Sequence, residues 1–418
     1  MSYHDDEDFW STGPADGYSV CANCFDDPDL ASHIDFSADS QECDFCGRRS
    51  RTRNIAAPLD GVVELMAEAI NRDYERAVEA LGWESAEGGY LGEHFDSRDL
   101  LVDYVGLRLP NDDDEQLLEI LVDCFGDEPW CHRNPYGLRG DEYLKFSWEH
   151  FCEFIKHERR YFFLHEETAD ESSHEYLTPA QILEFVSKSA KEHSLIQIHP
   201  LGTLLYRARQ QRAGEVLDLP YSFGPPPVEL ATKPNRMSPA GIVMFYGSDD
   251  IQTAVAEIDD DPKSGILVGT FRTTRGFSIL DFTVLPRRLR FFETQSDTDS
   301  RDRYALSFLH DFVLSLAAKV EPGKREHIDY VPTQVVTEYF RTVFRREDGT
   351  PIDGIRYFSA QRDGGKSIVL FADQDDIVLR ESHVQRLVAT GKFERWQLMH
   401  EDAWLELVRK RVIRSRSD

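Results

Sequence analysis

The sequence predicts an α+β protein with three parts: a small cysteine-bearing segment, a mainly helical region, and a C-terminal domain with a mixed or antiparallel sheet. Two C-x2-C pairs lie near the N-terminus, apolar residues then recur at helical spacing, and short β-rich segments begin after Ile196. A chain of 418 residues has room for two or three domains. The predicted boundaries are 1–53 for the cysteine segment, 54–170 for the helical domain, 171–196 for a linker helix and 197–418 for the C-terminal domain.

Acidic residues dominate the charge: 76 Asp and Glu stand against 47 Lys and Arg, which gives a formal net charge of −29. Such a surface repels phosphate backbones, so nucleic acid is not an expected partner. No apolar run is long enough for a membrane span. The residues from Met1 to Trp10 are acidic and lack the basic and apolar regions of a signal peptide, so a cytoplasmic protein is expected.

The cysteine segment predicts a structural zinc site. Cys21 and Cys24 form one C-x2-C pair, Cys43 and Cys46 form the other, and Gly47 suits the turn after the second pair. Each pair supplies two soft ligands from one tight turn, and four thiolates close the tetrahedron, so the metal has no open position for catalysis. Free thiols or a redox pair are the alternative. The loop between the pairs is acidic, which favours a scaffold or a docking role over nucleic-acid binding.

The region from about Asn54 to Glu167 is expected to be mainly helical. Apolar residues follow helical spacing over Leu59–Leu81 and over Glu115–Phe125, and acidic residues at 112–115 suit a helix start. The segment Trp148–Phe163 is rich in aromatic residues, which at this density are more often core than cofactor site.

Two further groupings in this region have alternative interpretations. Arg160 and His165 have the spacing of the ribonuclease motif of HEPN domains, but Tyr161 replaces the usual polar residue after the arginine. We therefore favour packing or dimerisation, and ribonuclease activity is the alternative. Several cysteines and histidines of this region could together form a second metal site, but buried free thiols are the more common arrangement. Its candidate ligands are Cys124, Cys131, His132, Cys152 and His157.

A domain boundary is predicted at 166–177, because an acidic, serine-containing stretch precedes a helix start. Thr178 suits an N-cap, Pro179 the first helical position and Gln181 a capping box, and the helix should run to about His193. The C-terminal domain should then contain strands at Leu201–Ala208, Ile242–Tyr246, Gly265–Arg272, Phe277–Asp281 and Ser367–Phe371, with helices at Asp302–Val320 and Pro332–Phe344.

Six motifs, in this order along the chain, resemble the RES domain family. The second motif lacks the family's Gly and Trp. The N-terminal 170 residues look like the zinc-bearing HEPN-like domain found upstream of some RES domains. The six motifs are Tyr206-Arg207, Asn235–Gly241, Phe245-Tyr246, Ala254–Glu257, Tyr330–Gln334 and Gly354–Ser359.

The resemblance implies a fold related to ADP-ribosyltransferases and NAD+ as the substrate. RES proteins break the nicotinamide–ribose bond by hydrolysis or phosphorolysis and act as growth-arresting toxins, many of them held in check by an antitoxin. NAD+, phosphate and an antitoxin or other regulatory protein are thus the implied partners. HEPN-like domains often pair, so a homo-oligomer is a further expectation.

Residue chemistry assigns roles within these motifs. Arg207 and Arg236 suit the pyrophosphate, since a guanidinium presents a planar fork to phosphate oxygens. Glu257 suits the ribose and its developing positive charge. Tyr246 would stack on the nicotinamide or ribose, and Ser359 would hydrogen-bond the ribose or the amide. Alternatives to Glu257 are Glu229, Asp249 and Asp250, and alternatives to Ser359 are Ser238 and Ser367.

The sequence leaves four functions open. The first is an NAD+ glycohydrolase or phosphorylase that serves as a toxin or defence effector. The second is ADP-ribosyl transfer to a macromolecule, for which the same residues would serve. The third is a non-catalytic binding module, and the HEPN ribonuclease is a remote fourth.

Overall fold

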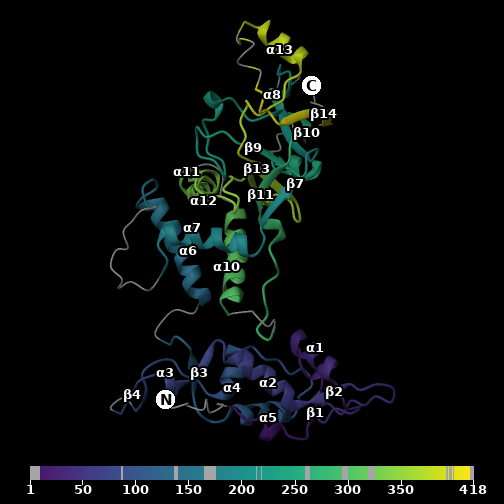
Figure 1. Ribbon diagram of the computed structural model, residues 1–418, viewed down its shortest axis with the longest axis vertical. Helices are drawn as coiled ribbons and strands as arrows, with labels where there is room; N and C mark the ends of the chain where they lie inside the picture. Colours follow the sequence, from purple (N-terminus) through teal and green to yellow (C-terminus); the bar gives the residue numbers. More distant parts are fainter. Residues whose placement is uncertain are drawn as a thin grey trace. The chain divides into compact units, whose positions relative to one another are not determined.

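The chain folds as two compact units, one of Met1–Leu144 with Arg287–Ser307 and one of Lys145–Pro286 with Phe308–Asp418 (Figure 1). Two helices, α6 (Gly140–His157) and α10 (Ser300–Ala317), contain residues of both units. The computed structural model describes residues 10–85, 88–135, 140–163, 176–212, 214–217, 219–258, 264–293, 300–318, 325–391, 394, 398 and 400–414.

The N-terminal unit is built around α2, which buries residues on most of its surface and so lies inside the core. The other elements are short and pack around it. They are η1 (Gly13–Ala15), β1 (Ser19–Cys21), η2 (Ala22–Cys24), α1 (Pro28–Ser37), β2 (Ala56–Pro58), α2 (Leu59–Ile70), β3 (Tyr74–Arg76), α3 (Ala77–Ala80), β4 (Trp83–Glu84), β5 (Gly89–Tyr90), α4 (Ser97–Asp99), η3 (Leu100–Tyr104), α5 (Gln116–Phe125) and β6 (Trp130–His132).

The helix expected over Leu59–Leu81 is interrupted. It ends at Ile70, because β3 pairs with β6 and thereby takes the next residues out of helical conformation. Arg76 fixes this pairing: its guanidinium lies 4.0 Å from the centroid of the Trp130 ring and donates to main-chain carbonyls. The helix expected over Glu115–Phe125 is confirmed as α5.

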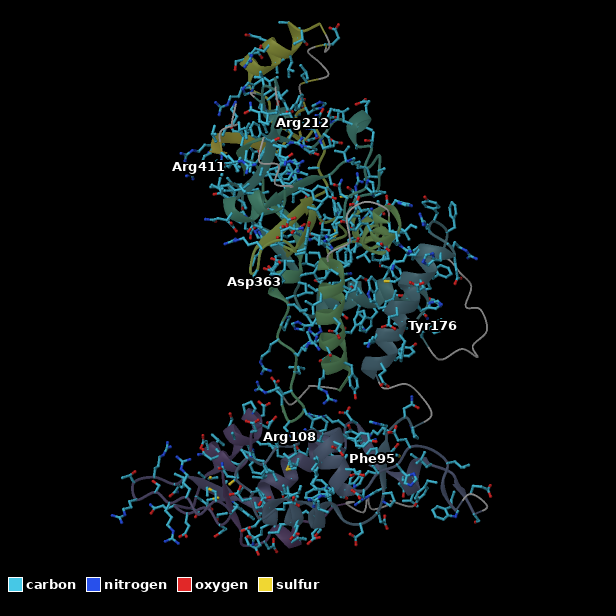
Figure 2. The ribbon with its side chains drawn as sticks, turned by 180° about the vertical axis from the view of Figure 1, so that it is seen from behind. Phe95, Arg108, Tyr176, Arg212, Asp363 and Arg411 are labelled. Atoms are coloured by element: carbon cyan, nitrogen blue, oxygen red, sulfur yellow. The ribbon has the colours of Figure 1, made fainter. Side chains whose placement is uncertain are left out.

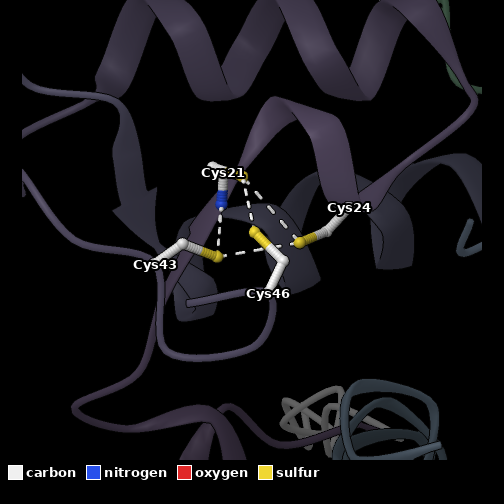
Figure 3. A group of neighbouring side chains, drawn as sticks. All are labelled: Cys21, Cys24, Cys43 and Cys46. Atoms are coloured by element: carbon white, nitrogen blue, oxygen red, sulfur yellow. Dashed lines mark hydrogen bonds between the residues drawn. The ribbon is translucent and has the colours of Figure 1, made fainter. Parts of the chain in front are cut away.

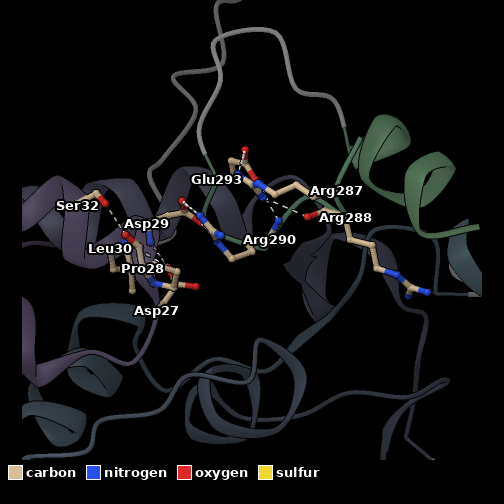
Figure 4. A network of polar contacts seen from close by, with 9 residues as sticks. All are labelled: Asp27, Pro28, Asp29, Leu30, Ser32, Arg287, Arg288, Arg290 and Glu293. Carbon is tan, nitrogen blue, oxygen red and sulfur yellow. Dashed lines mark hydrogen bonds and ion pairs between the residues drawn. The ribbon is translucent and has the colours of Figure 1, made fainter. Parts of the chain in front are cut away.

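Residues Arg287–Ser307 form an arm that belongs to the N-terminal unit although they lie inside the sequence of the C-terminal domain. Phe292 is 2% exposed in the N-terminal core. The Arg290 guanidinium donates from Nε and Nη2 to the two carboxylate oxygens of Asp29, each at 2.6 Å (Figure 4). Arg303 forms an ion pair with Asp73. The sequence predicted one contiguous domain over 197–418. The arm differs from this prediction because it buries Phe292 in the core of the N-terminal unit.

The C-terminal unit contains a mixed eight-stranded sheet in the order β14-β10-β8-β9-β13-β12-β11-β7. Neighbouring strands are antiparallel except β11 and β12, which are parallel. The predicted mixed sheet is therefore confirmed. Its strands are β7 (Ile196–His199), β8 (Leu204–Gln211), β9 (Phe245–Ser248), β10 (Gly265–Thr273), β11 (Phe277–Asp281), β12 (Gly354–Phe358), β13 (Lys366–Leu370) and β14 (Leu405–Arg414).

The edge strands β7 and β14 were absent from the predicted strand set. β14 has little sequence alternation because its residues 408–413 are exposed, as Arg411 in Figure 2 illustrates. The capping box at Thr178 and Gln181 is confirmed at the start of α7. No helix in the described ranges is long and apolar enough to cross a membrane. The helices of this unit are α7 (Pro179–Glu192), α8 (Pro220–Phe223), η4 (Val228–Leu230), α9 (Ile251–Ala256), η5 (Phe282–Val284), α11 (Glu326–Asp329), α12 (Val331–Thr342) and α13 (Glu381–Val388), besides the shared α6 and α10.

The arm should stabilise the N-terminal unit. Phe292→Ala removes a buried ring and should lower the free energy of unfolding of this unit by about 3 kcal/mol. Hydrogen exchange of the α2 amides measures that free energy. Phe36, which is 93% exposed on α1, provides the control, and Phe36→Ala should change it by less than about 0.5 kcal/mol. Equal exchange in Phe292→Ala and in the unsubstituted protein would show that the arm is not part of this core.

Candidate active site

Glu257 is delivered to the sheet by the short helix α9, which follows β9 directly. Asp250 caps the start of α9, since its carboxylate accepts from the main-chain N–H of Thr253 at 2.9 Å and from the Thr253 hydroxyl at 2.7 Å. Glu257 is the C-cap residue and its side chain is exposed. The cap thus fixes where the helix begins, and six residues later the chain presents a carboxylate to solvent.

Two serine hydroxyls converge on Glu257. Ser359, just after β12, donates to Glu257 Oε1 at 2.6 Å, and Ser367, in β13, donates to the same oxygen at 2.8 Å. The structure therefore joins both the predicted serine and one of its two alternatives to the predicted glutamate.

Tyr357 is a buried residue of this site that the motif analysis did not single out. Register places it opposite Ser367, which in turn lies opposite Ser248 of β9, so the three occupy one row across the sheet. Burial raises the pKa of the Tyr357 phenol, and the neighbouring Tyr246 and Glu257 raise it further. Its position two residues before Ser359 was the available sequence signal, because alternate residues of an extended segment share a face.

Tyr246 packs into the site with its hydroxyl tied to the arginine motif. The Tyr246 hydroxyl and the Ser238 hydroxyl share a hydrogen bond of 2.9 Å. Burial raises the pKa of Tyr246 to about 12, so the phenol is neutral at physiological pH. Ser238, the other predicted alternative to Ser359, thus partners this tyrosine.

Arg207 lies in β8, next to Tyr206, the β8 residue that is registered opposite Ser248 of β9. Its Nη1 donates to the main-chain carbonyl of Tyr246 at 2.6 Å, and its guanidinium lies 5.5 Å from the centroid of the Phe245 ring. Burial, with the nearby Arg209, lowers the pKa of Arg207 to about 9, which leaves the group cationic at neutral pH. No acidic side chain pairs with Arg207 within the described ranges, and its Nε is buried without a hydrogen-bond partner. A half-buried cation with a buried, unpaired Nε favours an anionic ligand.

Arg236 closes the C-terminal end of α10. Its Nη1 donates to the carbonyls of Leu316 at 2.8 Å and of Ala318 at 2.5 Å, where the helix dipole is negative. The Thr333 hydroxyl donates to the main-chain carbonyl of Arg236 at 2.5 Å. The Arg236 guanidinium lies 5.6 Å from the centroid of the Tyr330 ring. The Tyr330–Gln334 motif therefore supports the arginine motif directly.

The predicted residues form two contact groups. One holds Glu257 with Ser359, and the other holds Arg207 with the Tyr246 carbonyl. The charge of Arg236 acts on both Tyr246 and Tyr357, which places it near the same phenols. No hydrogen bond or ion pair joins either arginine to Glu257 in the part of the chain that the structure describes.

The alternatives to Glu257 have other partners or positions. Asp249 pairs with Arg356 at 3.2 Å, and Asp250 pairs with Arg362 at 2.9 Å. Glu229 is exposed on η4. Glu257 is thus the one of these four carboxylates that receives both serine hydroxyls.

The four N-terminal cysteines meet in the N-terminal unit (Figure 3). The Sγ–Sγ distances are 3.9 Å for Cys21–Cys24, 3.5 Å for Cys21–Cys46 and 3.6 Å for Cys24–Cys43. A tetrahedral zinc with Zn–S bonds of about 2.3 Å separates its sulfurs by about 3.8 Å, so the four sulfurs fit one ion. Gly47 has φ +65°, as the turn after the second pair requires.

The helical region contained two further candidates, a second metal site and the pair Arg160 and His165. The five residues considered for a second metal site form no such cluster among the residues that the structure describes. Arg160 donates to the Lys156 carbonyl at 3.0 Å at the end of α6, and His165 lies outside the described residues.

Comparisons with known proteins agree with this architecture. A family model for the RES domain matches residues 204–392, and one for HEPN/RES N-terminal domain 1 matches residues 37–169. The RES family is associated with toxins and with NAD+-related enzymatic activity. No curated protein and no solved structure matches the chain.

Zinc content tests the cysteine cluster. The protein refolded with zinc should carry one zinc ion per chain, measured by native mass spectrometry, because four thiolates complete its coordination. Cys24→Ser should lose the ion and destabilise the N-terminal unit. Cys152, which lies outside the cluster, supplies the control, and Cys152→Ser should keep the ion. A zinc-free but folded wild-type protein would contradict the assignment.

Proposed function

Because this chain belongs to the RES family and carries a HEPN/RES N-terminal domain, we propose that it degrades NAD+ by cleaving the bond between nicotinamide and ribose. Water or phosphate would accept the ADP-ribosyl group, and loss of NAD+ would make the protein a toxin or defence effector. The observation that carries this proposal is the exposed Glu257 carboxylate, oriented by two serine hydroxyls within a RES domain.

Cleavage of an N-glycosidic bond places positive charge on the ribose in an oxocarbenium-like transition state. A carboxylate that already faces the ribose stabilises this charge without reorganisation, which lowers the barrier. Nicotinamide leaves as a neutral molecule, so the step needs little acid catalysis. Glu257 therefore has the central catalytic role, and its hydroxyl-bound carboxylate would also orient the ribose hydroxyls.

The two arginines would bind the pyrophosphate. Arg207 is a half-buried cation with no acidic partner in the described ranges, and a phosphate oxygen would supply the missing negative charge. Arg236 faces the end of α10 with one terminal nitrogen, and the guanidinium has further N–H groups for a phosphate. Because the chain has a formal net charge of −29, an anion would bind only where local positive groups such as these arginines attract it.

Tyr246 and Ser359 would complete the pocket. The Tyr246 phenol is neutral, so its ring can stack on the nicotinamide or ribose without a charge penalty. Ser359 Oγ accepts from the main-chain N–H groups of Gln361 and Arg362 while it donates to Glu257. A hydroxyl with these three partners is suited to positioning and not to nucleophilic attack.

Purified protein should consume NAD+ and release nicotinamide. Glu257→Gln keeps the size of the side chain and removes its charge, so turnover should fall by at least about 100-fold. Chromatography of NAD+ and nicotinamide over time measures it, with and without phosphate. Glu229→Gln, an equal change at an exposed glutamate, should leave turnover unchanged.

Two outcomes would contradict the proposal. In one, folded wild-type protein leaves NAD+ intact under both conditions. In the other, Glu257→Gln retains full turnover. Label from NAD+ on a macromolecule, in place of free ADP-ribose or its phosphate, would identify ADP-ribosyl transfer as the reaction.

A further inference from the structure

We propose that Ser367 is a positioning residue that, together with Ser359, directs Glu257 Oε2 at the nicotinamide ribose of NAD+. This inference rests on the proposed function and assigns an atom to it. Both hydroxyls donate to Oε1, at 2.6 Å and 2.8 Å. Within the described residues no hydrogen bond or ion pair reaches Oε2. The carboxylate thus has one oxygen held by the protein and one available to a ligand.

Ser367 is a buried donor held within the sheet. It is 3% exposed and lies in β13, whose main chain pairs with β9 on one side and β12 on the other. Its Cα is opposite Ser248 and opposite Tyr357, so strand hydrogen bonds fix the direction of its side chain. Ser359 lies just after the end of β12, and its main-chain N–H still donates to the Gly365 carbonyl at 2.8 Å.

The proton positions follow from the partners. A serine hydroxyl has one proton and two lone pairs. Ser359 Oγ accepts from the N–H groups of Gln361 at 3.1 Å and Arg362 at 3.2 Å, which occupies both lone pairs and leaves its proton for Glu257. Glu257 Oε1 is the one hydrogen-bond partner of the Ser367 hydroxyl among the described residues. Both hydroxyl protons therefore point at Oε1.

The loop between the two serines holds the other end of α9, and Asp363 marks this loop in Figure 2. Arg362 donates to Asp250 at 2.9 Å and to the Thr253 hydroxyl at 2.7 Å. Gly365 packs so closely that a Cβ there would lie 2.7 Å from that hydroxyl. The segment from Ser359 to Ser367 thus fixes α9 at both ends, and the carboxylate keeps its orientation relative to the sheet.

A fixed Oε2 matters because the transition state carries the positive charge. An unrestrained carboxylate would have to lose rotational freedom as the cation forms, whereas an oriented one interacts at once. Loss of Ser367 should therefore slow the chemical step and leave ground-state binding of NAD+ through its pyrophosphate unaffected.

Steady-state turnover of NAD+ tests this assignment in the full-length protein. Ser367→Ala should lower kcat by about 10-fold or more with KM within about twofold of wild type. Ser367→Thr keeps the hydroxyl and should retain most of kcat. Ser278→Ala removes another strand hydroxyl, also 3% exposed in the same sheet, and should change neither constant. Ser367→Cys replaces the hydroxyl with a weaker donor and leaves no cavity, so it should lower kcat too if the alanine variant does not fold.

Binding by calorimetry supplies a readout independent of turnover. The probes are ADP-ribose and an analogue of it whose ribose ring carries a protonated nitrogen in place of the anomeric cation. Ser367→Ala should bind ADP-ribose normally and the cationic analogue about 10-fold more weakly. In a Glu257→Gln background the same serine change should have no further effect, because Ser367 acts through that carboxylate.

The outcomes separate this inference from the function on which it depends. If wild-type protein turns over NAD+ and Ser367→Ala has an unchanged kcat, the positioning role is wrong and the function stands. An equal loss of affinity for both probes would also overturn it, since that pattern indicates a damaged pocket. If wild-type protein neither consumes NAD+ nor binds ADP-ribose, the proposed function itself fails.

Discussion

The register between β12, β13 and β9 is the constraint on which the site depends. It aligns Tyr357, Ser367 and Ser248 in one row and turns them toward the face that α9 covers. Side chains alternate along a strand, so a slip of one residue would replace Ser367 with the apolar Ile368 and bury the serine in the opposite core. The apolar residues of that core therefore fix the register of β13. Only in this register does Ser367 join Ser359 as a hydroxyl donor to Glu257.

The arginines are positioned by a different means, since neither belongs to this row. Arg207 donates to the main-chain carbonyl of Tyr246 in β9, and Arg236 donates to two carbonyls at the end of α10. Main-chain carbonyls orient a guanidinium without neutralising it, whereas a carboxylate partner would cancel its charge. The fold thus retains positive charge in an acidic protein, while the negative charge of Glu257 is directed by neutral hydroxyls. This division suits a substrate with an anionic pyrophosphate and a ribose that becomes cationic.

Local signals in the sequence were the most informative, and long-range contacts were not visible in it. The cysteine spacing, the capping box at Thr178 and the helix α5 follow from residues close in the chain, and the structure has all three. The arm was not foreseen, because the bond between Asp29 and Arg290 joins positions 261 residues apart. Ser367 remained an alternative for the same reason: its proximity to Glu257 depends on strand pairing, which no spacing reveals. The break after Ile70 likewise reflects pairing of β3 with a distant strand.

The identity of the broken bond decides whether the protein cleaves NAD+ at the nicotinamide ribose. NAD+ incubated with the protein in H2(18)O, with and without phosphate, gives products whose masses identify the bond and the acceptor. We expect free nicotinamide together with ADP-ribose that carries one heavy oxygen, or ADP-ribose phosphate when phosphate is the acceptor. Nicotinamide mononucleotide and AMP as the products would place cleavage at the pyrophosphate and contradict the role given to Glu257.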